Sequence, residues 1–471
     1  MPRAPRYTPL AVFAAAAAIA LGPIGASAQV DLPALQDQAV EWLQQYIRIN
    51  TINPPGNEIE SARFFARIFD AEGIDYEIAE SAPGRGNIWA RLEGGDEPGI
   101  VLLHHMDVVP ADARFWDFDP LSGELRDGYI NGRGALDTKT SGILHLAAFL
   151  ALHRSGVPLD RDVIFMATAD EEAGGLYGAG WLVENRPELF DNIGFLLNEG
   201  GGGSLRDGEV SFGVEVTQKV PYWLHLSATG EPSHGSRPLV SYAMTEMLDA
   251  LERLREHEFE PRVIPPVDVA LKGSAANYPE PWRTRFMDLA TALREPGVDE
   301  ELHEYNAGRW ALTRNTCSIT RIEGSDKINV ISPEVWAELD CRLLPDQDPD
   351  AWLAEMHEVL GPEIDVEVIL GFSPAITSTD TELYETLREV SLEHFPGAPF
   401  VPQVSGGFTD SHFFRDLGIS AYGYNAVATP REDAGGVHGN NERVTEENVR
   451  RGVQMTLEIL ERFAGAEPVL E

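Results

Sequence analysis

Short runs of consecutive apolar residues alternate along the chain with stretches in which apolar residues recur every three or four positions. The runs at Ile100–Leu103, Val163–Ala169 and Ile193–Leu197 are typical of buried strands. Thr138–Arg154 carries its apolar residues on one helical face and predicts a helix. Strands that are apolar throughout, separated by helices, occur in parallel sheets covered on both faces. The pattern therefore predicts an α/β fold with a mostly parallel sheet flanked by helices.

The same pattern returns towards the C-terminus. Ser420–Asn425 predicts another strand, and Thr445–Phe463 predicts an amphipathic helix. Thr445 is suited to cap this helix, because its hydroxyl can accept a hydrogen bond from the first turn. We therefore expect the last part of the chain to complete the domain that the first part begins.

The middle of the chain follows a different pattern. Tyr222–Thr229 alternates apolar residues as a half-exposed strand does, and Tyr242–Arg255 predicts a helix. A Pro-rich, acidic stretch from about Glu256 to Glu301 predicts loops, and two further strands surround Asn329. This order predicts an inserted α+β domain over residues 219–335, which divides the larger domain into residues 29–218 and 336–471.

Residues 1–28 have the layout of a secretory signal peptide. Arg3 and Arg6 precede an apolar run from Leu10 to Leu21, and Ala26-Ser27-Ala28 provides a cleavage site. The run is shorter than the roughly 20 residues that a spanning helix needs. We expect an exported protein, periplasmic or secreted, without membrane attachment after cleavage, and an uncleaved anchor is the alternative.

The charge of the chain excludes one broad class of function. Its 471 residues include 36 basic and 76 acidic side chains, which gives a net charge of −40. A protein that binds nucleic acid through electrostatic attraction needs a basic surface, so nucleic acid is not an expected partner. Attachment to anionic lipid is disfavoured for the same reason. The length suggests two or three domains at roughly 100–200 residues each.

The chain contains only two cysteines, Cys317 and Cys341. They are too few for a structural zinc site made of four Cys or Cys/His ligands in paired spacing. If Arg314–Ile322 and Val335–Leu344 form a hairpin centred near Asn329, the two cysteines face each other. A disulfide bond and a pair of buried free thiols both remain open, and thiol titration of the unfolded, unreduced protein distinguishes them.

Two common catalytic motifs are absent from the sequence. Gly200–Gly203 is rich in glycine, but no Gly-Lys-Ser/Thr follows it, so a phosphate-binding loop is unsupported. No Gly-x-Ser-x-Gly nucleophile motif occurs either. Neither a nucleotide-dependent nor a serine-hydrolase mechanism is therefore indicated.

Histidines and carboxylates recur instead near the ends of the predicted strands. Each has an ordinary alternative role, such as a buried histidine, a helix cap or a solvated acidic turn. Together they indicate more, because the carboxyl ends of parallel strands meet at one edge of an open α/β sheet. Two histidines and three carboxylates are suitable ligands for a pair of Zn²⁺ ions with one bridging carboxylate. The segments centre on His105 and Asp107, Asp137, Glu171 and Glu172, Glu199, and His438.

At this point the sequence resembles the dinuclear zinc exopeptidases and amidohydrolases, a family that includes aminoacylase, acetylornithine deacetylase, succinyl-diaminopimelate desuccinylase, carnosinase and glutamate-releasing carboxypeptidases. The likeness extends from Pro54–Glu58 to the C-terminal helix. It implies two Zn²⁺ ions per chain, with Co²⁺ or Mn²⁺ as alternatives. The implied roles are His105 and Glu199 on one zinc, Glu172 and His438 on the other, Asp137 as the bridge before a cis peptide, Asp107 orienting His105, and Glu171 as general base.

The resemblance also assigns roles within the inserted domain, which matches a lid that often forms the dimer. His234 would stabilise the oxyanion, often across the dimer, while Asn329 and Arg342 would grip the substrate carboxylate and carbonyl. The alternatives are a structural loop histidine and an ion pair of Arg342 with Asp340. Two features depart from the family pattern: His104 replaces a small residue, and the stretch from Glu256 to Glu301 matches no motif.

The function implied by the resemblance is hydrolysis of an amide bond that releases a C-terminal amino acid. The substrate would be a small peptide or an N-acyl amino acid, cleaved by a carboxypeptidase or an N-acyl-amino-acid amidohydrolase. Glu rather than Asp at position 199 leans towards the deacylases. An aminopeptidase or dipeptidase on the same metal core is the alternative, and a non-catalytic binding protein is a third reading. A homodimer formed through the lid is also implied.

Overall fold

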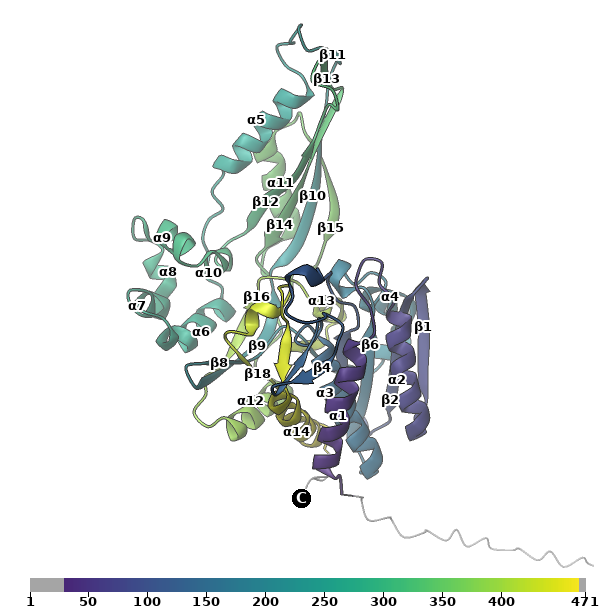
Figure 1. The fold of residues 1–471 in the computed structure, drawn as a ribbon. Helices are drawn as coiled ribbons and strands as arrows, with labels where there is room; N and C mark the ends of the chain where they lie inside the picture. The colour runs from purple at the N-terminus through teal and green to yellow at the C-terminus, as the bar shows by residue number, and fades with distance from the viewer. Residues whose placement is uncertain (1–28, 466–471) are drawn as a thin grey trace, which may run out of the picture.

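The computed structural model describes residues 29–465 as two parts, a main domain built on a large sheet and an elongated lid that projects from it (Figure 1). The predicted signal peptide lies outside the described residues. No helix within the described part of the chain combines the length and apolar character needed to cross a membrane.

The main sheet has ten strands, and its centre is parallel. The strands β6, β3, β7 and β17 lie side by side and run in the same direction. Because β16, β17 and β18 follow the lid in sequence, both ends of the chain are needed to build this sheet. The predicted α/β fold is confirmed. In spatial order the strands are β1 (Tyr76–Ala82), β2 (Arg85–Leu92), β6 (Arg161–Thr168), β3 (Glu97–His105), β7 (Ile193–Asn198), β17 (Ser420–Gly423), β9 (Glu209–Gln218), β8 (Gly202–Arg206) and β18 (Ala428–Pro430), with β16 (Phe400–Ser405) on β9.

The continuous apolar runs arise because both faces of this sheet are covered. In β3, Ile100 and Leu102 belong to the larger core, whereas Val101 and Leu103 belong to a smaller core on the opposite face. Successive side chains of a strand point to opposite faces, so both sets must be apolar. The larger core is covered by α1 (Leu32–Ile47), α2 (Glu58–Glu72), α3 (Lys139–Ser155), α12 (Glu382–His394) and α14 (Glu446–Phe463), and the smaller by α4 (Ala179–Asn185) and α13 (Ser411–Asp416).

His104, one of the two departures from the family pattern, is buried on the face of the sheet that packs in the larger core. Its Nε2 lies 3.2 Å from the hydroxyl oxygen of Tyr46, and its ring packs edge-on against Phe65. Gly142 makes the room, since a Cβ at that position would lie 2.3 Å from the imidazole. Burial lowers the pKa of His104 well below its usual value, so the side chain is neutral.

The lid is a four-stranded antiparallel sheet in the order β12-β14-β10-β15, with α5 (Ala243–Glu256) and α11 (Pro349–Leu360) on one face. Leu224 and Leu226 face the helices, while Trp223 and His225 are partly exposed on the other face, as the alternation predicts. The strands are β10 (Val220–Thr229), β12 (Thr316–Glu323), β14 (Glu334–Leu343) and β15 (Asp365–Gly371).

The predicted end of the inserted domain at residue 335 is therefore wrong. Both β14 and β15 pair with β10, so the lid continues to Gly371. The sequence does not mark this boundary clearly, because α11, which follows β14, repeats the helical pattern of the main domain.

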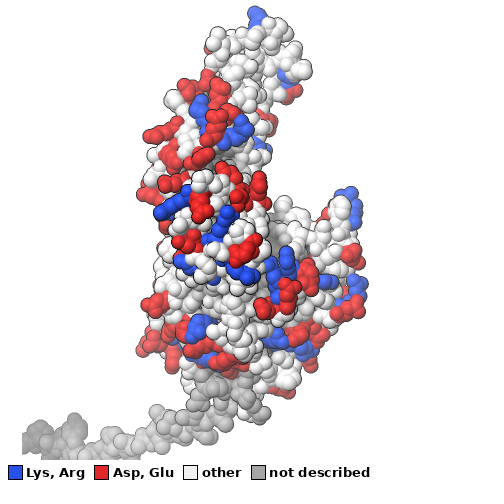
Figure 2. Space-filling view, turned by 90° about the vertical axis from the view of Figure 1, so that its left-hand side faces the viewer, with Lys and Arg blue, Asp and Glu red and all other residues white. Residues whose placement is uncertain are grey.

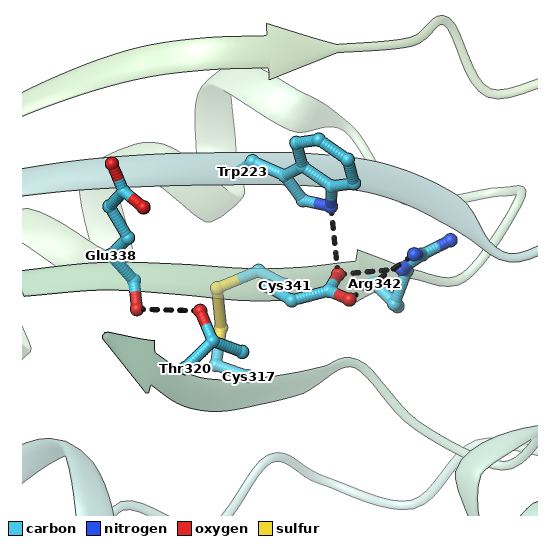
Figure 3. The surroundings of a disulfide bond; sticks show 7 residues. Trp223, Cys317, Thr320, Glu338, Cys341 and Arg342 are labelled. Atoms are coloured by element: carbon cyan, nitrogen blue, oxygen red, sulfur yellow. Dashed lines mark hydrogen bonds and ion pairs between the residues drawn. A yellow bond between two sulfur atoms is a disulfide. The ribbon is translucent and has the colours of Figure 1, made fainter. Parts of the chain in front are cut away.

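A disulfide bond joins β12 to the centre of the lid sheet (Figure 3). Cys317 lies opposite Cys341 in the register of β12 and β14, and the structure links them covalently. The two strands therefore pair as the sequence predicts, with the cysteines opposite each other. The bond closes a loop of 24 residues, which restricts the unfolded chain and stabilises the lid.

The stretch from Glu256 to Glu301 is helical rather than loop-rich, so this prediction is wrong. Its helices are short, and prolines begin or precede several of them, which gave the stretch the composition of a loop. Pro265, for example, occupies the first turn of α6. They share a core of their own around Trp282, Phe286 and Leu302, and α6 packs on β16. The helices that begin in the stretch are α6 (Pro265–Ser274), α7 (Trp282–Arg285), α8 (Leu289–Ala292) and α9 (Val298–Tyr305), and α10 (Ala307–Ala311) follows them.

Two small sheets complete the structure. One joins β19 (Arg443–Thr445) to β5 (Tyr129–Asn131) and β4 (Glu124–Arg126), and so brings the segment before α3 beside the segment before α14. The other joins β11 (Ser233–His234) to β13 (Val330–Ile331) at the far end of the lid (Figure 1).

Candidate metal centre

His105 is the last residue of β3 and points into a polar cluster at the carboxyl edge of the main sheet. Its side chain is 1% exposed. Nδ1 lies 3.0 Å from the backbone oxygen of Asp107, and Nε2 lies 3.1 Å from Oδ1 of Asp137 and 3.6 Å from Oε1 of Glu199. When Nδ1 donates to that carbonyl, the lone pair of the neutral ring is on Nε2, which faces the carboxylates.

Asp137 lies at the centre of the cluster, in the loop before α3. Its Oδ1 faces His105, whereas its Oδ2 lies 3.2 Å from Nε2 of His438. The peptide bond that follows, Asp137–Thr138, is cis, as the family resemblance implies. One carboxylate thus presents its two oxygens to two different histidines, which is the arrangement of a bridging ligand.

The second half of the cluster contains Glu172 and His438. The Oε2 atom of Glu172 lies 3.1 Å from Nε2 of His438. Among residues 29–465, two groups of donors lie close enough to hold a metal ion: His105, Asp137 and Glu199, and Asp137, Glu172 and His438, each with donor atoms within 4.8 Å of one another. The structure therefore brings all five predicted ligands together as two sites that share Asp137.

Asp107 holds the turn that carries Glu171 and Glu172. Its Oδ1 accepts a hydrogen bond of 3.1 Å from the backbone N–H of Glu171, and its Oδ2 accepts one of 3.1 Å from that of Glu172. Asn53 donates a further bond of 2.8 Å to Oδ2. The carboxylate itself lies 3.5 Å from Nδ1 of His105. Asp107 therefore fixes the backbone of two acidic residues as well as the nearby imidazole.

Glu171 is buried beside the first group of donors. Its Oε2 lies 4.0 Å from Nε2 of His105, too far to be a close ligand partner but within reach of a small molecule between them. It begins a short 3₁₀ turn, Glu171–Ala173, after Asp170, which has a φ of 71°. This sharp reversal directs Glu171 and Glu172 to different parts of the cluster.

The electrostatics of the cluster fit divalent cations. Burial raises the pKa of Glu171 well above its usual range, and the charge of Glu199 raises it further. Burial raises the pKa of Glu199 to about 7. Hydrogen bonds to Asp137 and Glu172 raise the pKa of His438 to about 10. Carboxylates crowded in a buried site destabilise one another unless cations compensate them, and the donor set suits Zn²⁺.

Asp410 is a further buried carboxylate near the cluster that the predicted site omitted. Its Oδ2 accepts a hydrogen bond of 3.1 Å from the hydroxyl of Thr168, at the end of β6. Gly175 allows this approach, because a Cβ there would lie 2.2 Å from Oδ1 of Asp410. No motif in the sequence around Asp410 marked this carboxylate as part of the site.

Arg342 lies where the lid meets the main domain. Its guanidinium pairs with Asp340 through a hydrogen bond of 2.7 Å from Nε and lies 5.8 Å from the centre of the Phe408 ring. Its Nη1 is buried and has no hydrogen-bond partner among the described residues. Phe408 precedes Thr409, which packs near Gly200, the residue after Glu199. The ion pair with Asp340 thus exists, and it leaves the Nη1 donor without a partner on the side chains described.

His234 and Asn329 lie elsewhere. Both are exposed and occupy the β11–β13 end of the lid, away from the main domain (Figure 1). The backbone N–H of Ser236 donates to Nδ1 of His234 over 3.1 Å, so the neutral ring carries its proton on Nε2. A single chain therefore does not bring these two predicted site residues to the metal-binding cluster.

Comparison with known proteins decides the family. The model of peptidase family M20/M25/M40 matches residues 101–462. The chain belongs to this family. Similar proteins include an N-fatty-acyl-amino acid synthase/hydrolase, PM20D1, of Xenopus tropicalis, 29% identical over 90% of this chain and 85% of that protein, and human aminoacylase-1, 25% identical over 92% and 97%. An M20 metallo-carboxypeptidase of Sulfolobus solfataricus has a similar structure, with a TM-score of 0.68 at 20% identity over 90% of this chain and 99% of that one.

The chain is therefore a metal-dependent hydrolase of the M20 family, a family characterised by a dinuclear metal site. Hydrolysis of amide bonds is the chemistry that its relatives share. The two groups of donors joined by Asp137 are the residues of this chain that fit such a site.

Proposed function

We propose that this protein is an exported dinuclear zinc amidohydrolase that releases an amino acid from an N-acyl amino acid or a small peptide. The observation that carries the proposal is the pair of donor groups sharing Asp137, with Glu171 beside them. The N-acyl substrate is preferred because the curated relatives are named for N-fatty-acyl amino acids and for aminoacylase activity.

His105 and Glu199 would hold one zinc ion, Glu172 and His438 the other, and Asp137 both. Bound metal would polarise the scissile carbonyl and lower the pKa of water to about 7. Co²⁺ or Mn²⁺ can replace zinc in a site of nitrogen and oxygen ligands, so the native metal depends on availability.

Glu171 is the group placed to move the proton. In the proposed mechanism its carboxylate accepts a proton from the attacking water and delivers it to the leaving amine. The bond from its backbone N–H to Asp107 fixes the start of the side chain.

Arg342 is placed to bind the carboxylate of the released amino acid. Its position near the end of β14, beside Phe408, and the unpartnered Nη1 support this role. Asp340 keeps the guanidinium oriented through Nε and Nη2, which leaves the opposite edge available for a charged hydrogen bond.

The exposed end of the lid supports a homodimer in which His234 serves the partner's site. His234 and Asn329 are too far along the lid to act within their own chain (Figure 1). Val240 and Ile328 are fully exposed next to them, and the lid's end is mostly uncharged in Figure 2 although the chain carries a charge of −40. Exposed apolar side chains at this end, Leu239 and Val330 among them, are suited to contact a second copy.

Export to the periplasm or the exterior is supported by the signal-like pattern of residues 1–28 and by the disulfide between Cys317 and Cys341. Disulfides persist in oxidising compartments.

The function is tested by amino-acid release from matched substrates. We expect release from N-acyl amino acids, whose amine is blocked, at rates at least equal to those from dipeptides with a free amine. High-performance liquid chromatography of the products measures both. Activity confined to substrates with a free amine would contradict the proposal and identify an aminopeptidase or dipeptidase, and no release at all from metal-loaded protein would leave a binding protein.

Replacing Arg342 tests whether this residue binds the carboxylate of the substrate. In R342M, kcat/KM for an N-acyl amino acid should fall about 10- to 100-fold, since a hydrogen bond to a charged group contributes about 1.5–3 kcal/mol. Hydrolysis of the corresponding C-terminal amide should change little. An equal loss of kcat/KM on both substrates would show that Arg342 does not bind the carboxylate.

A further inference from the structure

A buried ion pair lies directly behind the candidate metal centre. Nη1 of Arg133 lies 2.6 Å from Oε2 of Glu442, and the side chains are 2% and 0% exposed. Arg133 follows β5 and Glu442 precedes β19, so the small sheet formed by these strands brings the two residues together. Neither residue belongs to the five ligands or to the groups assigned to the reaction.

Glu442 binds the loop that carries the shared ligand. Its Oε1 accepts hydrogen bonds from the backbone N–H groups of Leu136, at 2.6 Å, and Asp137, at 3.0 Å. Its Oε2 accepts another from Gly134, at 3.0 Å. A carboxylate that receives several N–H groups fixes the backbone that supplies them. The position of Asp137 therefore depends on Glu442.

Arg133 binds the loop that carries His438. Its Nη2 donates to the backbone oxygen of Gly439 over 2.6 Å, and its Nη1 donates to that of Gly436 over 3.2 Å. These carbonyls lie on either side of His438, which has a φ of 54°. The guanidinium also lies 5.1 Å from the centre of the Trp116 ring. Arg133 thus holds the backbone around His438 at both ends.

The two donor groups differ in how much they need this support. The His105 side chain is 1% exposed and extends from a central strand, whereas the His438 side chain is 58% exposed and extends from a glycine-rich loop. A buried ion pair by itself adds little net stability, because desolvation offsets the attraction. In this pair, the other side-chain hydrogen bonds of Arg133 and Glu442 go to the backbone of the two loops that carry Asp137 and His438.

We propose that Arg133 and Glu442 are positioning residues that set the separation between Asp137 and His438 and thereby assemble the second metal site. The inference rests on the dinuclear centre of the proposed function. It predicts that disrupting the ion pair weakens the site formed by Asp137, Glu172 and His438 more than the site formed by His105, Asp137 and Glu199.

Zinc titration of the chelated, full-length protein by calorimetry tests the proposal. Wild type should bind two equivalents of Zn²⁺. The E442Q variant should bind one equivalent with nearly unchanged affinity and the other about 10- to 100-fold more weakly, as is usual when a group that supports a metal ligand is lost.

The H438A variant identifies which equivalent is affected. Adding E442Q to H438A should weaken zinc binding little further. R133K should weaken the same equivalent, because one lysine ammonium cannot bind the carbonyls of both Gly436 and Gly439. R133K serves as the test if E442Q does not fold.

A second buried pair gives a matched control. Nη2 of Arg415 lies 2.7 Å from Oε2 of Glu215, with side chains 3% and 0% exposed, and Glu215 receives no hydrogen bond from either ligand-bearing loop. E215Q should retain both zinc equivalents.

Unchanged zinc binding in E442Q and R133K would overturn the proposal. Equal weakening of both equivalents, together with a lower melting temperature of the metal-free protein, would also overturn it. Failure of wild type to bind two equivalents would instead contradict the dinuclear centre itself.

Discussion

Replacement of Glu171 by glutamine is expected to lower kcat about 10²- to 10⁴-fold while the protein keeps its zinc, since this is the usual contribution of a general acid–base group. Glutamine has nearly the same shape and retains the backbone hydrogen bond to Asp107, but its amide cannot accept the proton from water. Steady-state kinetics on an N-acyl amino acid, with metal content determined on the same samples, measures both quantities.

The neighbouring residue supplies the control. Glu172 also donates its backbone N–H to Asp107, but its carboxylate faces His438 rather than His105. E172Q should therefore lose metal affinity, whereas E171Q should not. An E171Q enzyme with intact zinc and a rate near that of wild type would show that another group moves the proton.

Replacement of His234 by alanine is expected to reduce kcat about 10²- to 10³-fold, the usual cost of removing one oxyanion donor. The ring is held with Nε2 as the donor, because Ser236 donates to Nδ1. Since His234 lies at the end of the lid, the site that loses this donor is expected to be the partner's. H234A should therefore leave zinc binding and the dimer intact.

Mixing two inactive variants tests this exchange. In a mixed dimer of E171Q and H234A, one site has an intact base and receives an intact histidine from the partner. Refolding or exchanging the two together should restore about a quarter of wild-type activity, because half of the dimers are mixed and each has one complete site. No recovery in verified mixed dimers would contradict a contribution across the interface, and a fully active H234A would remove His234 from the mechanism.

The fold was predictable where burial imposes a period on the sequence. Val101 and Leu103 must be apolar, as must Ile100 and Leu102, because helices cover both faces of β3. The helices between Glu256 and Glu301 could not be recognised in the same way, since they are too short to show a helical period. The end of the lid was misplaced because α11, which follows β14, has the same helical pattern as the helices of the main domain.

Four of the ligands were predictable because they lie at or just beyond the end of a strand or just before a helix, and His438 because a histidine stands in a glycine-rich loop before the last helix. The residues that position them carry no such signature. Asn53, Arg133 and Glu442 act mainly through hydrogen bonds to backbone or to another carboxylate, and only the folded chain brings their partners close. The place of His234, at the end of the lid, likewise depends on tertiary structure.

Metal dependence of the reaction tests the central claim most directly. The protein would be stripped of metal with a chelator, titrated with Zn²⁺, and assayed for amino-acid release from an N-acyl amino acid at each ratio. We predict that activity is lost in the stripped protein and rises to its maximum as the second equivalent binds, in line with two sites that share Asp137. Full activity in verified metal-free protein would contradict the account.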